Sequence, residues 1–218
     1  MDMLWYAVYG SKINRDHFLE YIRGGTSAFN GQTLPGCRNK QDPIRDYALG
    51  ITHELYFARN SVPWGGAMAF VLPQQSRTKT LGRAYLITAE QFVDVACQQN
   101  GRRPGDPEFA LDYKFAESNQ ESYFNPADPS RAAGQAKQWY GRILRVGERE
   151  SWPVFTVTCE WSGYGDPNAP GRSYLTTIVK GFQQLGRISG QAMVEYFGSR
   201  VGLKDRISRP VLERWMMG

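Results

Sequence analysis

Apolar and polar positions at the start of the chain change from a strand-like run to helical spacing. Residues 3–9 are aromatic and β-forming and predict a buried strand. Beyond Gly10, apolar residues recur at i, i+3 and i+4 in the segment that Asn14 opens, and this spacing predicts a short helix ended by Gly24. The opening unit is therefore a strand, a tight turn and a helix.

The same patterns continue along the chain but do not alternate regularly between strands and helices. A Thr88…Gln91 capping box opens a helix that runs to about Gln99. The irregular order disfavours a doubly wound parallel sheet and favours an α+β fold, with an antiparallel or mixed sheet and helices packed around it. We predict strands at about 47–58, 67–72, 81–87, 140–147 and 153–161, further helices at 173–185 and after Ser189, and loops at 26–46 and about 100–138.

Length and apolar content fit a single domain over residues 1–218. No apolar run is long enough to span a bilayer, so no membrane association is expected. Asp2 stands where a signal peptide would carry positive charge, so no secretory signal is expected. The three cysteines are widely spaced and form no CxxC pair, which predicts free thiols in a reducing compartment and a cytoplasmic location.

The net charge of +5 does not indicate a nucleic-acid partner, because the basic residues are scattered rather than gathered in a patch. His17 and His53 are isolated from each other in the sequence, so neither a metal site nor a Ser-His-Asp triad is expected. No nucleotide-binding glycine motif occurs, and no cofactor is predicted. The sequence does not indicate an oligomeric state.

Three places carry candidate chemistry. The first is the turn Tyr9-Gly10-Ser11-Lys12, whose backbone N–H groups suit an anion or oxyanion; the alternative is a plain strand-to-helix turn. The second is Gln99, which lies on the apolar face of its helix, where a polar group needs a partner or a cavity; the alternative is a frayed helix end. The third is Trp64, followed by two glycines, which can wall a pocket or anchor the core.

These segments resemble the γ-glutamylcyclotransferase-like (AIG2-like) family. Val8-Tyr9-Gly10-Ser11 after an aromatic strand is similar to the family's Tyr-Gly-Ser-Asn signature. The matching blocks span most of the chain in the same order as in one branch of that family. They are residues 5–11, 55–58, 64–70, 84–92 and 170–181.

The resemblance implies a small mixed, mostly antiparallel β-barrel with flanking helices, and a lyase without a cofactor. The implied reaction is intramolecular: the α-amine of a γ-glutamyl amide attacks its own γ-carbonyl, giving 5-oxoproline and a released amine. The residues implied to bind this small-molecule substrate are Tyr9, Gly10, Ser11 and Lys12, with Trp64 as a further wall. A glutamate serves as the acid/base in the family, and its place falls on Gln99 here.

Two departures from the family pattern matter: Lys12 replaces the signature asparagine, and Gln99 cannot act as a general base. Three explanations stay open. The chain is an engineered inactive variant, a natural member with another base (Lys12, Glu90 or Asp94), or a relative that binds without catalysis. A different lyase or cyclase reaction in a biosynthetic pathway is a further alternative. If Lys12 points into the pocket, we expect a carboxylate-bearing ligand.

Overall fold

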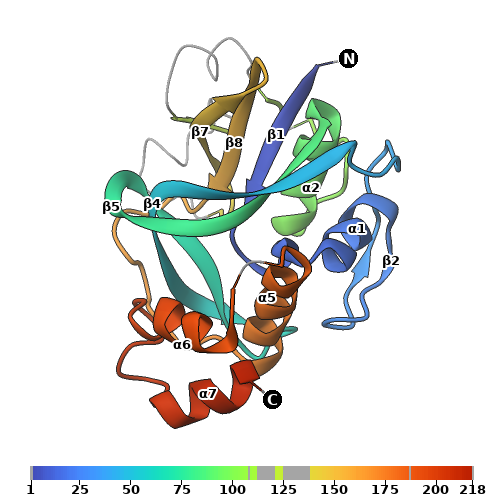
Figure 1. The fold of residues 1–218 in the computed structure, drawn as a ribbon. Coiled ribbons are helices and arrows are strands. Elements are labelled where there is room, and N and C mark those ends of the chain that lie inside the picture. Colours follow the sequence, from blue (N-terminus) through green and yellow to red (C-terminus); the bar gives the residue numbers. More distant parts are fainter. Residues whose placement is uncertain (1, 108, 112–120, 125–137, 187, 218) are drawn as a thin grey trace.

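A computed structural model describes residues 2–107, 109–111, 121–124, 138–186 and 188–217 (Figure 1). The described residues form an α+β fold, in which a six-stranded mixed sheet is covered by helices. This confirms the predicted class. The strand order in the sheet is β4-β5-β1-β8-β7-β6.

Strand β1 (Met3–Val8) lies inside the sheet and brings the chain to the candidate site. It pairs antiparallel with β5 and parallel with β8 (Trp152–Thr158). All six of its residues except Met3 are buried, as expected for a strand covered on both faces. Beyond β8, the antiparallel strands β7 (Arg142–Arg149) and β6 (Glu121–Tyr123) complete the sheet.

The hairpin of β4 (Arg45–Ser61) and β5 (Gly66–Thr88) is longer than the sequence predicts. The strands expected at 67–72 and 81–87 are two parts of the single strand β5. Pro73 lies within β5, between the paired residues Val71 and Gln75 and beside register shifts in the ladder. A residue without an N–H is tolerated at such an irregularity.

The side chain of Thr158 is one of the links between the middle of this hairpin and β8. The Thr158 hydroxyl in β8 donates to the carbonyl of Val71 at 2.6 Å and accepts from its N–H at 3.2 Å. Within the described residues, the ladder ends at β4 and at β6, and the closed barrel stays a prediction.

Two predicted loops contain strands. Residues 26–46 were expected to be irregular, yet β2 (Gly25–Thr26) and β3 (Thr33–Leu34) form a two-stranded ladder there. The polar segment 100–138 includes β6, which Ser122 anchors as a buried residue. The parts of that predicted loop at 112–120 and 125–137 lie outside the described residues.

Helices gather in two places (Figure 1). Helices α1 and α2 lie beside β1, whereas α5, α6 and α7 lie together at the opposite end of the molecule from the N-terminus. None of the described helices combines the length and apolarity needed to cross a membrane. The bounds are η1 (Ser11–Ile13), α1 (Arg15–Arg23), α2 (Ala89–Gln99), α5 (Arg172–Gln184), α6 (Gly190–Gly198) and α7 (Arg209–Met217).

The predicted helix caps are confirmed. The Asn14 side chain accepts from the N–H groups of Asp16 and His17, and Thr88 and Gln91 form both halves of a capping box. These signals are local, which is why the sequence reveals them. Helix α7 was not predicted.

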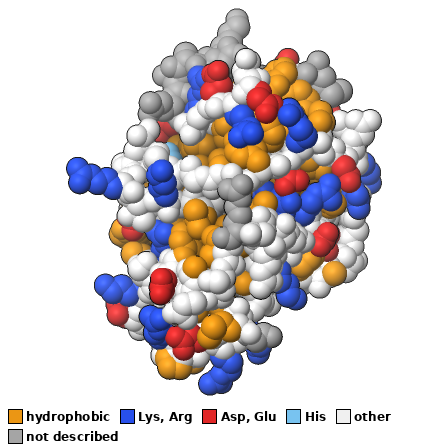
Figure 2. Space-filling view, in the orientation of Figure 1, with side chains coloured by type: hydrophobic (Ala, Val, Ile, Leu, Met, Phe, Trp, Pro, Cys, Tyr) orange, Lys and Arg blue, Asp and Glu red, His pale blue; other side chains and the backbone are white. Residues whose placement is uncertain are grey.

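Charges on the surface are mixed. On the face shown in Figure 2, Lys and Arg side chains are spread out with Asp and Glu between them. This matches the scattered basic residues in the sequence.

A candidate binding cavity at the turn after the first strand

The chain leaves β1 through a turn that packs tightly against helix α5. A Cβ added to Gly10 would lie 2.6 Å from the hydroxyl oxygen of Tyr174, closer than carbon and oxygen can approach. A larger residue at position 10 would therefore require the Tyr174 side chain to shift. The short helix η1 follows at once, and its residues are buried.

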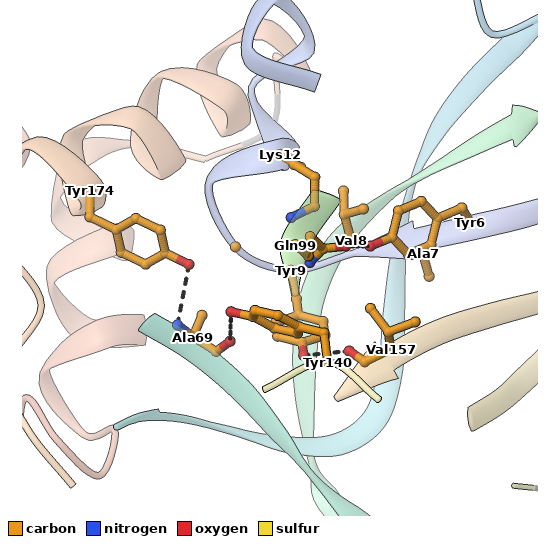
Figure 3. A pocket seen from close by; sticks show the side chains of 11 residues that line it. Tyr6, Ala7, Val8, Tyr9, Lys12, Ala69, Gln99, Tyr140, Val157 and Tyr174 are labelled. Carbon is orange, nitrogen blue, oxygen red and sulfur yellow. Dashed lines mark hydrogen bonds between the residues drawn. The ribbon is translucent and has the colours of Figure 1, made fainter. Parts of the chain in front are cut away.

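This turn forms part of the wall of a small cavity (Figure 3). The volume is ≈ 20 Å³, enough for about one ordered water, since roughly 10–15 Å³ is needed. Its walls come from β1, the turn, β5, the end of α2, the segment before β7, β8 and α5. The residues that line it are Tyr6, Ala7, Val8, Tyr9, Gly10, Lys12, Ala69, Gln99, Tyr140, Val157 and Tyr174.

Gln99 enters the cavity from the last turn of α2. Its Oε1 accepts a hydrogen bond of 2.8 Å from the hydroxyl of Tyr6 in β1. The helix end is held by Asn100, whose N–H donates to the carbonyl of Ala96. The Gln99 side chain is therefore a positioned hydrogen-bonding group and not a frayed, solvated one.

Lys12 brings a cationic group to the same cavity. The residue is 8% exposed, and its Nζ lies 5.0 Å from the ring centre of Tyr21 and 5.7 Å from that of Tyr140. Among the described residues it forms no hydrogen bond or ion pair through Nζ. Burial lowers the pKa of Lys12 to about 7, because the charged form is disfavoured away from water.

Three tyrosine hydroxyls supply neutral polar groups to the walls. The Tyr140 hydroxyl donates to the carbonyl of Ala69, and the Tyr174 hydroxyl accepts from the N–H of the same residue. Burial raises the pKa of Tyr174 to about 12 and those of Tyr6 and Tyr140 further. All three hydroxyls therefore keep their protons at neutral pH.

A larger outer cavity adjoins the inner one at Gln99, which lines both. Its volume is ≈ 390 Å³, and its other lining residues are Asn100, Arg102, Gln138 and Trp139. A ligand that places a small group in the inner cavity would thus have room for the rest of its atoms outside.

The site residues predicted from the sequence fall into two groups: those that line the inner cavity and those that lie behind its wall. Tyr9, Gly10, Lys12 and Gln99 line the inner cavity, although they come from two separate parts of the chain. The hydroxyl of Tyr9 donates a hydrogen bond of 2.7 Å to the carbonyl of Val157.

Two other predicted residues lie behind the cavity wall. Ser11 and Trp64 are buried but do not line the space. Trp64 packs edge-on against Tyr174 at 5.1 Å and against His17 at 5.3 Å. Trp64 therefore supports Tyr174, which itself faces the cavity.

The alternative bases Glu90 and Asp94 lie away from the cavity lining. Asp94 is fully buried and pairs with Arg38 at 2.9 Å, and Glu90 is exposed and pairs with the same guanidinium at 3.4 Å. Both carboxylates have a structural role at the outer face of α2. Of the three alternatives, Lys12 alone lines the inner cavity.

Sequence reasoning did not single out Tyr6, Tyr140 and Tyr174 as site residues. Tyr6 and Tyr174 occur in apolar patterns typical of core positions. A buried tyrosine needs a partner for its hydroxyl, and that requirement was the available signal. In the part of the chain that the structure describes, no group of three or more His, Cys, Asp or Glu side chains is arranged to hold a metal ion.

Comparison with known proteins gives one curated relative. No known family's sequence profile matches the chain. Histone deacetylase 5 of Arabidopsis thaliana is 30% identical over 210 residues, and the match covers 91% of this chain and 31% of that protein. The chain thus spans about a third of the length of the relative, whose name describes the whole protein.

The similar solved structures include the following three. A gamma-glutamyl cyclotransferase aligns with a TM-score of 0.48 and 11% identity, over all of both chains. The uncharacterized Homo sapiens protein loc79017 gives a TM-score of 0.48 and 12% identity, again over all of both chains. YkqA of Bacillus subtilis gives 0.43 and 15%, over 89% of this chain and 53% of its own. Alignments with these scores carry no argument about function. The function of the cavity must therefore be argued from the residues that line it.

Proposed function

We propose that this chain is a γ-glutamylcyclotransferase-like protein that holds a γ-glutamyl amide, or a related amide, in the cavity between the Gly10 turn and Gln99. The observation that carries the proposal is that these two features line one cavity, although 89 positions separate them in the sequence (99 − 10). The predicted substrate-binding residues are Tyr9, Gly10, Ser11 and Lys12, with Trp64 behind the wall.

The proposed reaction needs donors for an oxyanion and a group that moves protons. As the α-amine attacks the γ-carbonyl, negative charge develops on the carbonyl oxygen, and positioned N–H or O–H groups stabilise it. A base must take a proton from the ammonium and return it to the leaving amine. Gln99 has the shape and reach for the second role but no titratable proton. Position 99 would carry that role as a glutamate.

A second candidate is a binding protein on the same scaffold that does not catalyse. The contact between the Tyr6 hydroxyl and Gln99 Oε1 favours it, because it fixes an uncharged amide where the reaction needs a base. Such a protein would hold γ-glutamyl ligands, or another small acid, without converting them.

A paired assay tests both candidates. The chain and its Gln99→Glu variant are incubated with a panel of γ-glutamyl amines, and 5-oxoproline is followed by mass spectrometry. Gln191→Glu, on the exposed face of α6, is the matched control, because it adds the same charge far from the cavity residues in sequence. The proposal expects turnover by Gln99→Glu and none from the control beyond that of the unchanged chain.

The outcomes separate the candidates. Turnover by Gln99→Glu alone makes position 99 the base and the unchanged Gln99 chain a silent binder. Turnover by both chains places the base elsewhere, with Lys12 the next residue to change. No turnover by either chain, with ligand binding retained, refutes the cyclotransferase reaction and leaves the binding candidate.

A further inference from the structure

The inner cavity contains one cationic group and no carboxylate. Lys12 is the only Lys, Arg, Asp, Glu or His among its lining residues, all of which are described. Figure 3 shows the Lys12 amine directed into the space bounded by Gln99 and Tyr140. Buried charges in proteins are normally paired or bound to a ligand. The described residues supply Lys12 with aromatic rings in place of an anion.

Among the described residues, no group packed around Lys12 supplies a counter-charge. The side chain of Gln99 in α2 is neutral, and the surrounding tyrosines keep their protons, because burial raises their pKa values. His17 in α1 is neutral near pH 7, since burial lowers its pKa to about 4, and it bonds Glu20. The Glu20 carboxylate in turn also binds Ser27 and Ala28. The tyrosines are Tyr6, Tyr9, Tyr21, Tyr140 and Tyr174.

The shape of the site restricts what can reach Lys12. The inner cavity holds about one water, so only a small terminal group fits beside the amine without rearrangement. The larger outer space begins at Gln99. A carboxylate is small, supplies the missing charge, and accepts hydrogen bonds from an ammonium in ordinary geometry.

We infer that Lys12 makes this cavity selective for acidic ligands, and that a carboxylate entering the inner cavity takes up a proton with it. The inference rests on the proposed function for its ligand class, and it adds Lys12 as the residue that sets the specificity. The proton is taken from solvent by the neutral amine, and the resulting ammonium pairs with the carboxylate. The only bond that forms is the N–H bond of the ammonium, and the solvent that gives up the proton loses one O–H bond.

Binding and protonation are linked thermodynamically. In the empty cavity the pKa of Lys12 is about 7, and a bound anion raises it. At pH 6 the amine is already charged, whereas at pH 8 a proton must be acquired on binding. We therefore expect carboxylate affinity to fall about tenfold from pH 6 to pH 8. A neutral ligand of the same shape should show no such fall.

The experiment uses the full chain with ¹³C-labelled lysine, in which Lys12 is identified as the signal absent from Lys12→Met. Its Cε shift is titrated from pH 5 to 11 alone, with acetate, with 5-oxoproline, and with the neutral amide of 5-oxoproline. The expected result is a midpoint near 7, raised by both carboxylates and unchanged by the amide. A midpoint that acetate and 5-oxoproline leave in place would overturn the inference.

Two variants separate charge from shape. Lys12→Arg keeps a cation that stays protonated, so carboxylate affinity should become independent of pH between 6 and 8. Lys12→Met should bind 5-oxoproline no better than its amide. If Lys12→Met keeps the preference for the acid, or if Lys12→Arg keeps the tenfold fall with pH, Lys12 is not the selective residue.

Failure of this inference is distinguishable from failure of the proposed reaction. If no chain produces 5-oxoproline yet carboxylates raise the Lys12 midpoint, the reaction is refuted and the acid-selective cavity stands. If turnover occurs but the Lys12 midpoint does not respond to carboxylates, the reaction stands and the acid-selective cavity is refuted.

Discussion

Two buried cations lie at the short helix η1, and their surroundings differ. Arg83 in β5 is 5% exposed and pairs with Asp46 at 2.6 Å. It also donates to the carbonyl of Ile13 at 3.1 Å and so holds η1 from one side. Lys12, the preceding residue in η1, points into the cavity and has no ion pair within the described residues.

This difference indicates which of the two cations serves the fold. A buried charge with a partner and further hydrogen bonds is a structural feature, and breaking it is costly. A buried cation without a partner at a cavity is destabilising, and strongly perturbed groups of this kind cluster at functional sites. The turn therefore has one cation that fixes its position and another that is available to a ligand.

The largest effect is expected from removing the partner of the structural cation. Asp46→Ala leaves Arg83 buried and without its carboxylate, which should lower the free energy of unfolding by about 3–5 kcal/mol. Urea denaturation measures it. The control is Asp42→Ala, which removes the exposed pair with Arg23 and should cost less than about 1 kcal/mol. Equal losses in the two variants would contradict the structural role of Arg83.

Removing the unpaired cation should have the opposite sign. The pKa of Lys12 is about 7 in the folded chain and about 10.4 when unfolded. The unfolded chain therefore binds more protons between these values, and stability rises with pH across this range. Lys12→Met should thus be more stable by roughly 2–4 kcal/mol at pH 6, with the gain vanishing above about pH 10.

Thermal unfolding at pH 6 and at pH 9 measures this gain. Lys180→Met, on the exposed face of α5, is the control and should change stability similarly at both pH values. A Lys12→Met chain that is less stable than the unchanged chain at pH 6 would show that the amine has a partner that stabilises it.

The features of the fold that depend on local signals can be predicted from the sequence. The strand over 3–9, the Asn14 cap and the Thr88 capping box follow from residue types at fixed offsets, and the structure contains all of them. The turn at Gly10 follows from a glycine after a buried strand. By contrast, the sequence predicts two strands at 67–72 and 81–87, where the structure has the single strand β5, paired with β4 through register shifts beside Pro73.

The rest of the site depends on contacts that no local pattern specifies. Tyr140 and Tyr174 reach the cavity because β8 pairs parallel to β1 and α5 packs on the turn. Spacing in the sequence indicates neither event. Whether Lys12 is solvated or buried is likewise decided by distant residues, and so the sequence left both readings open. Trp64 was chosen as a wall, but it supports Tyr174 from behind.

A third titratable group near η1, His17, should make the stability of the chain depend on pH in the acid range. Burial lowers the pKa of His17 to about 4, against about 6.5 when unfolded. The unfolded chain binds more protons between these values, so stability should be lost as pH falls from 6.5 to 4. His17→Phe should remove about 2 kcal/mol of that loss. Unfolding midpoints at pH 7 and pH 4.5 measure it, and an unchanged slope in the variant would assign the acid sensitivity elsewhere.

The smallest effect concerns the contact that positions Gln99. Tyr6→Phe removes the hydroxyl that donates to Gln99 Oε1 and should cost about 1 kcal/mol of stability, as for a neutral hydrogen bond. In a Gln99→Glu background the same hydroxyl would donate to a carboxylate, and its loss should cost roughly 1.5–3 kcal/mol. Urea denaturation of the four chains measures the coupling. Identical costs in the two backgrounds would mean that the introduced carboxylate turns away from Tyr6, and that position 99 does not place a charge opposite Lys12.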